Sequence, residues 1–202
     1  MKIYDAAEQV YQIPQSLLSL PSGGGVSDAD SSLRFSYVES PFSFAVERGD
    51  TNETLFNTSG SALIFESQYI RLRTSLPDSP YIYGLGEDSD PLRRPTTNYT
   101  RTLWNVGDAF LPNNSNLYGA HPIYVEMRDG QAHGVFLGNS DGMDVKINNT
   151  ADSGQYLEYN AIGGVFDFYF LAGPSPSEVS QQYSGVVGLV SLKSKMSHYT
   201  LT

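Results

Sequence analysis

The sequence has no cysteine among its 202 residues. Disulfides, thiolate-bound metals and cysteine nucleophiles are therefore excluded, and stability has to come from an apolar core. Basic residues are also scarce, because 12 Lys and Arg stand against 22 Asp and Glu and give a net charge of −10. Binding to nucleic acid depends on clustered positive charge, so we expect no nucleic-acid partner.

Long apolar runs are missing as well. No stretch approaches the roughly 20 apolar residues of a membrane helix, so we expect no membrane partner. Residues 1–5 lack the basic start and apolar run of a signal peptide. If the protein is secreted, we expect that this chain has lost its leader.

What the sequence does contain is typical of a globular domain, with 40% hydrophobic and 12% aromatic residues. From residue 42 onward the apolar residues recur with a period of two, which is the pattern of half-buried antiparallel strands. Segments 122–128 and 133–139 flank the turn Asp129-Gly130 and predict a hairpin. Segments 143–147 and 156–159 continue the alternation.

Residues 165–171 are almost continuously apolar, which predicts a strand buried on both faces. So many short strands separated by turn residues favour a mainly β fold, an antiparallel sandwich or barrel. One helix is predicted at the C-terminal end, because Ser175, Pro176 and Glu178 combine an N-cap, a first-turn proline and a capping box. Its apolar face would hold Val179, Tyr183, Val186 and Val187.

Three strings carry a resemblance to a known family. The most specific is Asn-Leu-Tyr-Gly-Ala-His-Pro at residues 116–122, preceded by Gly-Leu-Gly-Glu at 84–87 and followed by Gly-Gly-Val-Phe-Asp-Phe-Tyr at 163–169. Over residues 35–188 the chain resembles the N-terminal β-sandwich of glycoside hydrolase family 31, the α-glucosidase family. The resemblance implies a galactose-mutarotase-like antiparallel sandwich with one C-terminal helix.

The resemblance also sets the expected domain organisation. Residues 1–188 would form the sandwich domain, with a flexible loop at 21–32 and a closing helix at 175–187, and 189–202 would be a divergent tail. In this family the catalytic carboxylates lie on a (β/α)8 barrel, so no catalytic residue is expected here and the closing helix would expose its apolar face towards that barrel. We expect the N-terminal domain or a truncated form of an α-glucosidase. A stand-alone carbohydrate-binding module and a non-functional fragment are the alternatives.

Two residues are candidates for contact with carbohydrate. Family members carry an Asp on a loop that reaches across the mouth of the barrel and binds sugar hydroxyls, and the resemblance places Asp108 there, with one extra residue in the loop. The alternative is that Asp108 is a turn acid beside Gly107. Trp104, the only tryptophan, can stack on a pyranose ring, because the C–H face of a sugar is apolar, but a single tryptophan in a β domain is more often a core or loop anchor.

Other acidic residues are weaker candidates. Asp141 and Asp144 form a conceivable catalytic pair, although a turn-stabilising acid and a strand-edge residue are the simpler interpretation. The acidic cluster of Glu87, Asp88 and Asp90 is a candidate cation-binding site, but its ligands lack the spacing of a calcium loop. We therefore expect no metal and no cofactor.

Five Asn-x-Ser/Thr sequons lie in segments rich in Gly, Asp, Thr and Asn. Each alone is a weak pattern, but all five are expected in exposed turns, which favours a glycosylated protein of the secretory pathway. The candidate glycosylation sites are Asn52, Asn57, Asn98, Asn113 and Asn148.

Overall fold

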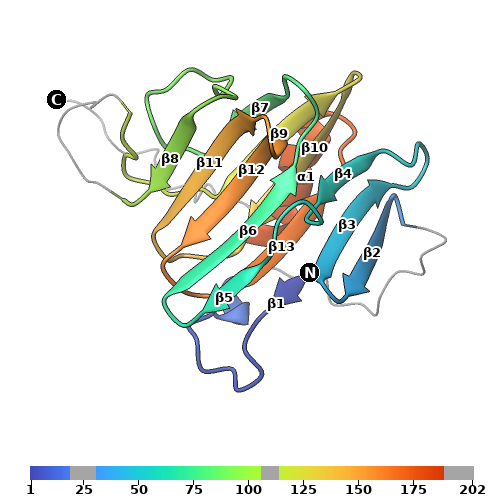
Figure 1. Ribbon diagram of the computed structural model, residues 1–202. Helices are drawn as coiled ribbons and strands as arrows, with labels where there is room; N and C mark the ends of the chain where they lie inside the picture. Colours follow the sequence, from blue (N-terminus) through green and yellow to red (C-terminus); the bar gives the residue numbers. More distant parts are fainter. Residues whose placement is uncertain (19–30, 106–113, 189–202) are drawn as a thin grey trace, which may run out of the picture.

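The computed structural model describes residues 1–18, 31–105 and 114–188, which form three antiparallel sheets and one α-helix (Figure 1). The first five-stranded sheet has the order β1 (Lys2–Ile3), β13 (Phe166–Leu171), β10 (Gln131–Leu137), β9 (Ile123–Arg128) and β7 (Tyr81–Gly84). The second has the order β5 (Ile64–Glu66), β6 (Tyr69–Ser75), β12 (Gly154–Ala161), β11 (Met143–Thr150) and β8 (Tyr99–Leu103). A three-stranded sheet consists of β2 (Leu33–Glu39), β3 (Phe42–Arg48) and β4 (Thr54–Asn57). The helical segments are the short η1 (Gln15–Leu17) and α1 (Pro176–Val187).

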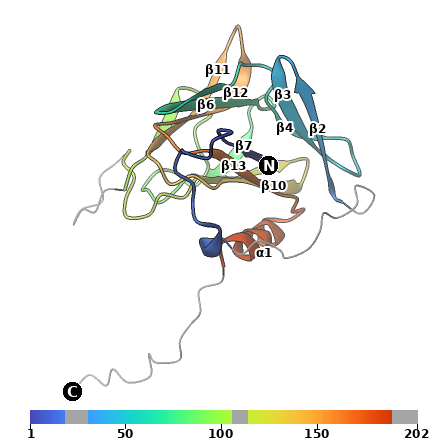
Figure 2. The same ribbon diagram turned by 90° about the horizontal axis from the view of Figure 1, so that it is seen from below.

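The two five-stranded sheets face each other and enclose the main core, as the view from below shows (Figure 2). The strands of the second sheet alternate inward apolar and outward polar residues, which is the pattern of a sheet that packs on one face. The first sheet also carries apolar residues on its outer face, at Ile123, Val125 and Met127. The sandwich expected from the sequence is therefore confirmed. The inward side chains of both sheets include Ile70, Leu72, Ile82, Tyr124, Val135, Val145, Ile147, Leu157, Tyr159, Phe166 and Phe168.

The predicted hairpin is present as β9 and β10, which pair from Arg128 opposite Gln131. Asp129 and Gly130 both have positive φ, at 46° and 81°. Two consecutive residues with positive φ match the right-handed twist of the flanking strands, which is why Asp-Gly occurs here.

Strand β13 was expected to be buried on both faces, and this is wrong for one of them. Phe166 and Phe168 point into the core and are fully buried, whereas Asp167 and Tyr169 on the opposite face remain partly exposed. The reason is that only part of this outer face is covered.

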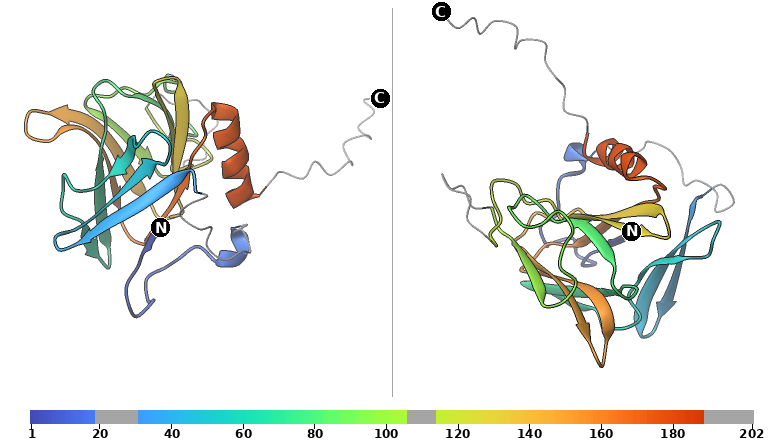
Figure 3. Two further views of the ribbon diagram at one scale, coloured as in Figure 1. Left: turned by 90° about the vertical axis from the view of Figure 1, so that its right-hand side faces the viewer. Right: turned by 90° about the horizontal axis from the view of Figure 1, so that it is seen from above.

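The cover is α1, which lies against the outer face of β10 and β13 (Figures 2 and 3). The capping box is confirmed, because the Ser175 hydroxyl accepts a hydrogen bond from the Glu178 backbone N–H and the Glu178 side chain accepts one from the Ser175 N–H. Val179 is 1% exposed, and the ring of Tyr183 packs at 5.2 Å on Phe136.

The expectation that this helix would expose its apolar face is therefore wrong for Val179 and Tyr183, because the domain's own sheet covers them. Val187 at the end of the helix is 37% exposed. The predicted loop at 21–32 falls largely outside the described residues, and so does the tail at 189–202. Among the described residues, no helix has the length and apolarity to cross a membrane.

Candidate functional site

A pocket of about 470 Å³ opens where β8 ends and β11 begins, and we call it the Trp104 pocket. It is formed by the ends of five strands, since β8 leads into it, the β10–β11 connection crosses it, and the segments after β12 and before β9 border it. Its lining is Leu103, Trp104, Asn105, Ala120, Pro122, Asn139, Ser140, Asp141, Gly142, Met143 and Ile162.

The indole ring of Trp104 packs against Gly142 at the side of this pocket. An added Cβ at Gly142 would come within 2.4 Å of the indole ring, so the absence of a side chain is what admits the ring. Trp104 is 59% exposed and Ile162, on the other side of Gly142, is 56% exposed. The interpretation of Trp104 as a core anchor is therefore wrong, because the indole is held in place and yet most of it faces solvent.

Register explains how the sequence brings these residues together. Strand β8 pairs with β11 so that its last residue, Leu103, lies opposite Met143, which places the following residue, Trp104, beside Gly142. Asp144 lies further along β11, where its carboxylate accepts a 2.6 Å hydrogen bond from the Thr102 hydroxyl on β8. The structure thus separates the two acids, because Asp141 lines the pocket and Asp144 does not.

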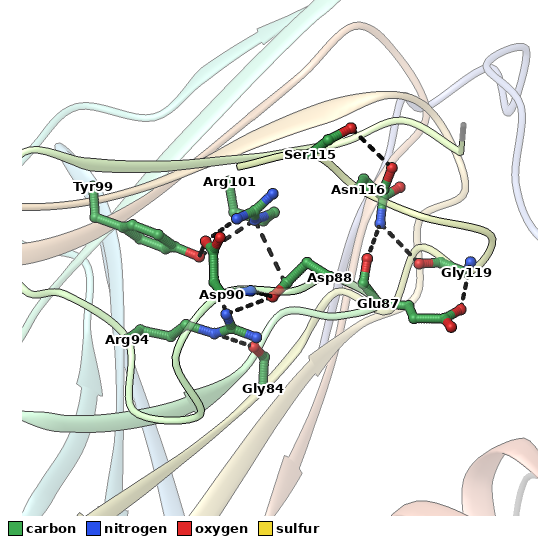
Figure 4. A network of polar contacts seen from close by, with 10 residues as sticks. All are labelled: Gly84, Glu87, Asp88, Asp90, Arg94, Tyr99, Arg101, Ser115, Asn116 and Gly119. Carbon is green, nitrogen blue, oxygen red and sulfur yellow. Dashed lines mark hydrogen bonds and ion pairs between the residues drawn. The ribbon is translucent and has the colours of Figure 1, made fainter. Parts of the chain in front are cut away.

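The border of the pocket before β9 is held by two of the three strings that carry the family resemblance, those at 84–87 and 116–122 (Figure 4). The Asn116 side-chain amide donates hydrogen bonds to the carbonyls of Glu87 at 3.0 Å and Gly119 at 2.8 Å. The Gly119 N–H donates to the Glu87 carboxylate at 3.1 Å, and the His121 N–H donates to the Gly86 carbonyl at 2.7 Å. Gly-Leu-Gly-Glu and Asn-Leu-Tyr-Gly are therefore two sides of one hydrogen-bonded unit.

Next to this unit lies a buried ionic cluster that the sequence analysis missed. Arg94 contacts the Asp88 carboxylate at 2.8 Å, while Arg101 bonds to Asp90 and lies 3.6 Å from Asp88 (Figure 4). The four charged side chains are at most 6% exposed. The Tyr99 hydroxyl also donates to Asp90 at 3.1 Å, and burial raises the pKa of Tyr99.

These contacts correct the idea that Glu87, Asp88 and Asp90 gather around a cation. Asp88 and Asp90 are neutralised by arginines, and the Glu87 carboxylate is bonded to the Gly119 backbone instead. The arginine partners of these acids were hard to predict from the sequence. Arg101 lies on a separate strand, β8, and only the folded structure places it beside the acidic segment.

Replacing Arg101 with methionine should destabilise the domain by about 3 kcal/mol, because it leaves Asp90 buried without its main partner. Urea unfolding followed by circular dichroism measures this loss. Arg93→Met is the matched control, since Arg93 is exposed and stacks on the ring of Tyr81, with no ion pair to an acidic side chain of the described residues. Equal stability of the two variants would contradict a structural role for the cluster.

The sequons divide into two groups. Asn52 and Asn98 are exposed and have positive φ, at 58° and 51°, as turn residues do. Asn57 ends β4 and Asn148 lies inside β11, and both are partly buried, so the expectation that all five lie in turns is wrong for these two. Asn113 falls outside the residues that the structure describes.

Asp108 also falls outside the described residues, in the segment 106–113 that follows Asn105. The expected role of Asp108 in binding sugar hydroxyls therefore stays a prediction. The residues that sequence reasoning missed are Gly142, Ile162 and Asn139. Asn139 and Gly142 belong to the Asn-Ser-Asp-Gly-Met string at 139–143, whereas Ile162 lies in a separate segment after β12.

Comparisons with known proteins agree with this geometry. Residues 8–145 match the model of the glycosyl hydrolase 31 N-terminal galactose mutarotase-like domain. The chain is 56% identical over 195 residues to a probable alpha/beta-glucosidase of Aspergillus flavus, covering 96% of this chain and 22% of that protein. It is 41% identical over 206 residues to alpha-xylosidase 1 of Arabidopsis thaliana, covering 92% of this chain and 22% of that protein.

Solved structures show the same fold. A dextranase of Flavobacterium johnsoniae complexed with isomaltotriose aligns with a TM-score of 0.64 at 24% identity, over 78% of this chain and 19% of that one. The glucosidase II alpha subunit aligns with a TM-score of 0.63 at 15% identity, over 78% of this chain and 22% of that one. The chain spans about a fifth of the length of its curated relatives. It belongs to glycosyl hydrolase family 31, whose N-terminal galactose mutarotase-like domain it contains.

Proposed function

We propose that this chain is the substrate-facing N-terminal domain of a longer enzyme that hydrolyses terminal glucosyl residues. The catalytic carboxylates of that enzyme would lie on a (β/α)8 barrel, which the described residues do not contain. The observation that carries the proposal is the Trp104 pocket, in which a single indole is fixed on Gly142 and still 59% exposed.

The chemistry of this pocket suits a sugar. A pyranose has an apolar C–H face that packs on an aromatic ring, and hydroxyls around its edge that bond to amides and carboxylates. Asn105, Ser140 and Asp141 supply such polar groups beside the indole. Asp108, the predicted sugar-binding acid, follows three positions after Asn105 in the sequence.

The pocket on its own supports binding rather than hydrolysis. Glycosidases generally need two carboxyl groups, about 5–5.5 Å apart for retention or about 6.5–9.5 Å apart for inversion. The described lining of the pocket includes one carboxylate, Asp141, while Asp144 is bonded to Thr102 outside it. The second carboxylate would therefore have to come from elsewhere.

We also propose that the parent enzyme passes through the secretory pathway and is glycosylated. Asn52 and Asn98 support this, because both are exposed in turns where a glycan can be attached without disturbing a strand. Peptide mapping of the protein from its native source, before and after enzymatic deglycosylation, tests the idea. Unmodified Asn52 and Asn98 would contradict it.

The role of Asp108 is tested in a chimera that joins this domain to a family 31 barrel. Asp108→Ala should lower kcat/KM for maltose by roughly 1–3 kcal/mol of transition-state free energy, because a hydrogen bond to a charged group is lost. Asp144→Asn is the control, since Asp144 lies outside the pocket. Unchanged kinetics in the Asp108 variant would make that residue a simple turn acid.

A further inference from the structure

The Asp141 carboxylate is the one acidic group that lines the described part of the Trp104 pocket. Its Oδ2 atom is buried and has no hydrogen-bond partner among the described residues. Burying a carboxylate oxygen without a hydrogen-bond donor costs free energy of folding. We therefore look for the missing donor outside the protein, in a bound ligand.

Asp141 is not needed to hold the turn on which it lies. The Asn139 side chain does that, because its Oδ1 accepts the Asp141 backbone N–H at 2.8 Å. The Asn139 amide nitrogen in turn donates to the carbonyls of Gly163 at 3.0 Å and Val165 at 3.1 Å. Asn139 is 6% exposed, so this support is rigid. The interpretation of Asp141 as a turn-stabilising acid is therefore wrong.

The backbone around the carboxylate leaves room for it. Gly164 has a φ of +76°, and an added Cβ there would come within 2.5 Å of Asp141 Oδ2. Any other residue at this position would be strained and would push the carboxylate away. Gly142 makes room for Trp104 in the same manner, so two glycines admit the two groups that a sugar site needs.

We propose that Asp141 is a sugar-binding residue that accepts hydrogen bonds from the hydroxyls of a neutral hexopyranose packed on Trp104. The inference rests on the proposed function, since it assigns a ligand class and a residue to the same pocket. A carboxylate only accepts hydrogen bonds, so the ligand has to donate, and it repels anionic ligands, as does the net charge of −10. The aromatic face selects a ring with an apolar side over an acyclic polyol.

All the groups in this argument belong to the described part of the chain, so the isolated protein should bind sugar without a barrel. Trp104 is the only tryptophan, so intrinsic fluorescence reports on this pocket alone. Titration of the 202-residue chain with maltose should give a saturable change in emission. Sorbitol at equal concentration should give none.

The matched variants are Asp141→Asn and Asp144→Asn, two acids three residues apart of which only the first lines the pocket. Asp141→Asn should weaken maltose binding at least about tenfold, the equivalent of one charge-assisted hydrogen bond, while Asp144→Asn should bind as the parent does. If circular dichroism shows that Asp141→Asn is unfolded, Asp141→Ser takes its place.

Two results would overturn the inference, namely parental affinity in a folded Asp141 variant, and a parent chain whose fluorescence responds equally to maltose and sorbitol. Neither result bears on the proposed function, which is decided by the kinetics of the chimera. Conversely, maltose binding by the isolated chain together with an inactive, folded chimera would support Asp141 and contradict the role in hydrolysis.

Discussion

Purified as the 202-residue chain, the domain should show no turnover of an aryl α-glucoside above a buffer blank. Enzymes accelerate their reactions by at least ~10⁶-fold, and glycosidases obtain most of this from a pair of positioned carboxyl groups. The described pocket offers Asp141 alone, so the pair is incomplete. The expected effect is therefore the loss of essentially the whole rate enhancement.

The assay needs a preparation free of host glucosidase, because a trace of contaminating enzyme would exceed any residual activity. The chain carrying Asp141→Asn, purified in parallel, controls for this. Turnover that is present in the parent and absent from Asp141→Asn would contradict the prediction and make Asp141 catalytic. Turnover that is equal in both preparations identifies a contaminant.

Acidification should destabilise the domain strongly through His133. This side chain on β10 is 1% exposed, and neither ring nitrogen has a hydrogen-bond partner among the described residues. Burial, reinforced by the nearby Arg128 and Arg48, lowers the pKa of His133 from 6.5 to about 3. The unfolded chain therefore binds a proton between these two values while the folded chain does not.

The sign follows from this difference. The contribution of His133 to the free energy of unfolding is fully present above pH 6.5. It is lost as the pH falls towards 3, and the total loss is roughly 4–5 kcal/mol. Glu126 acts in the opposite direction, because its burial raises its pKa, against the effect of Arg128, and its protonation on acidification favours the folded state. Its Oε2 lies 3.5 Å from His133 Nε2, and its protonation offsets part of the loss.

Urea unfolding between pH 3 and pH 8, followed by circular dichroism, measures this dependence. His133→Leu removes the titrating group and should flatten the stability curve below pH 6.5. His121→Gln is the matched control, because His121 is an exposed histidine outside the core that surrounds His133. An equally steep loss of stability in His133→Leu would show that other groups are responsible.

Local patterns account for the elements that could be predicted. Alternation with period two marked β9, β10, β11 and β12, and Asp129-Gly130 marked the hairpin turn, because the twist of a two-residue hairpin selects residues with positive φ. The capping box at Ser175 and Glu178 likewise depends on residues three apart. Each of these signals is complete within a few residues, so no knowledge of the fold is needed to read it.

The candidate site could be predicted only in part. Trp104 was identified as a residue that can stack on a sugar, but the sequence favoured a core or loop anchor. That choice depends on whether another segment covers the ring, and in the structure the segment beside it is Gly142, which supports one side and leaves the other exposed. The role of Asp108 stays a prediction.

The sequence by itself determined the fold class and the family, because alternation, turn residues and the strings at 84–87 and 116–122 are local properties of the chain. Only the tertiary structure decided which residues form the pocket. Leu103 and Met143 are 40 positions apart in the sequence. The pairing of β8 with β11 brings Trp104 beside Gly142, so that Trp104 and Asp141 both line the Trp104 pocket. Such pairing is set by how whole sheets bury their apolar faces, and no short stretch of sequence contains that information.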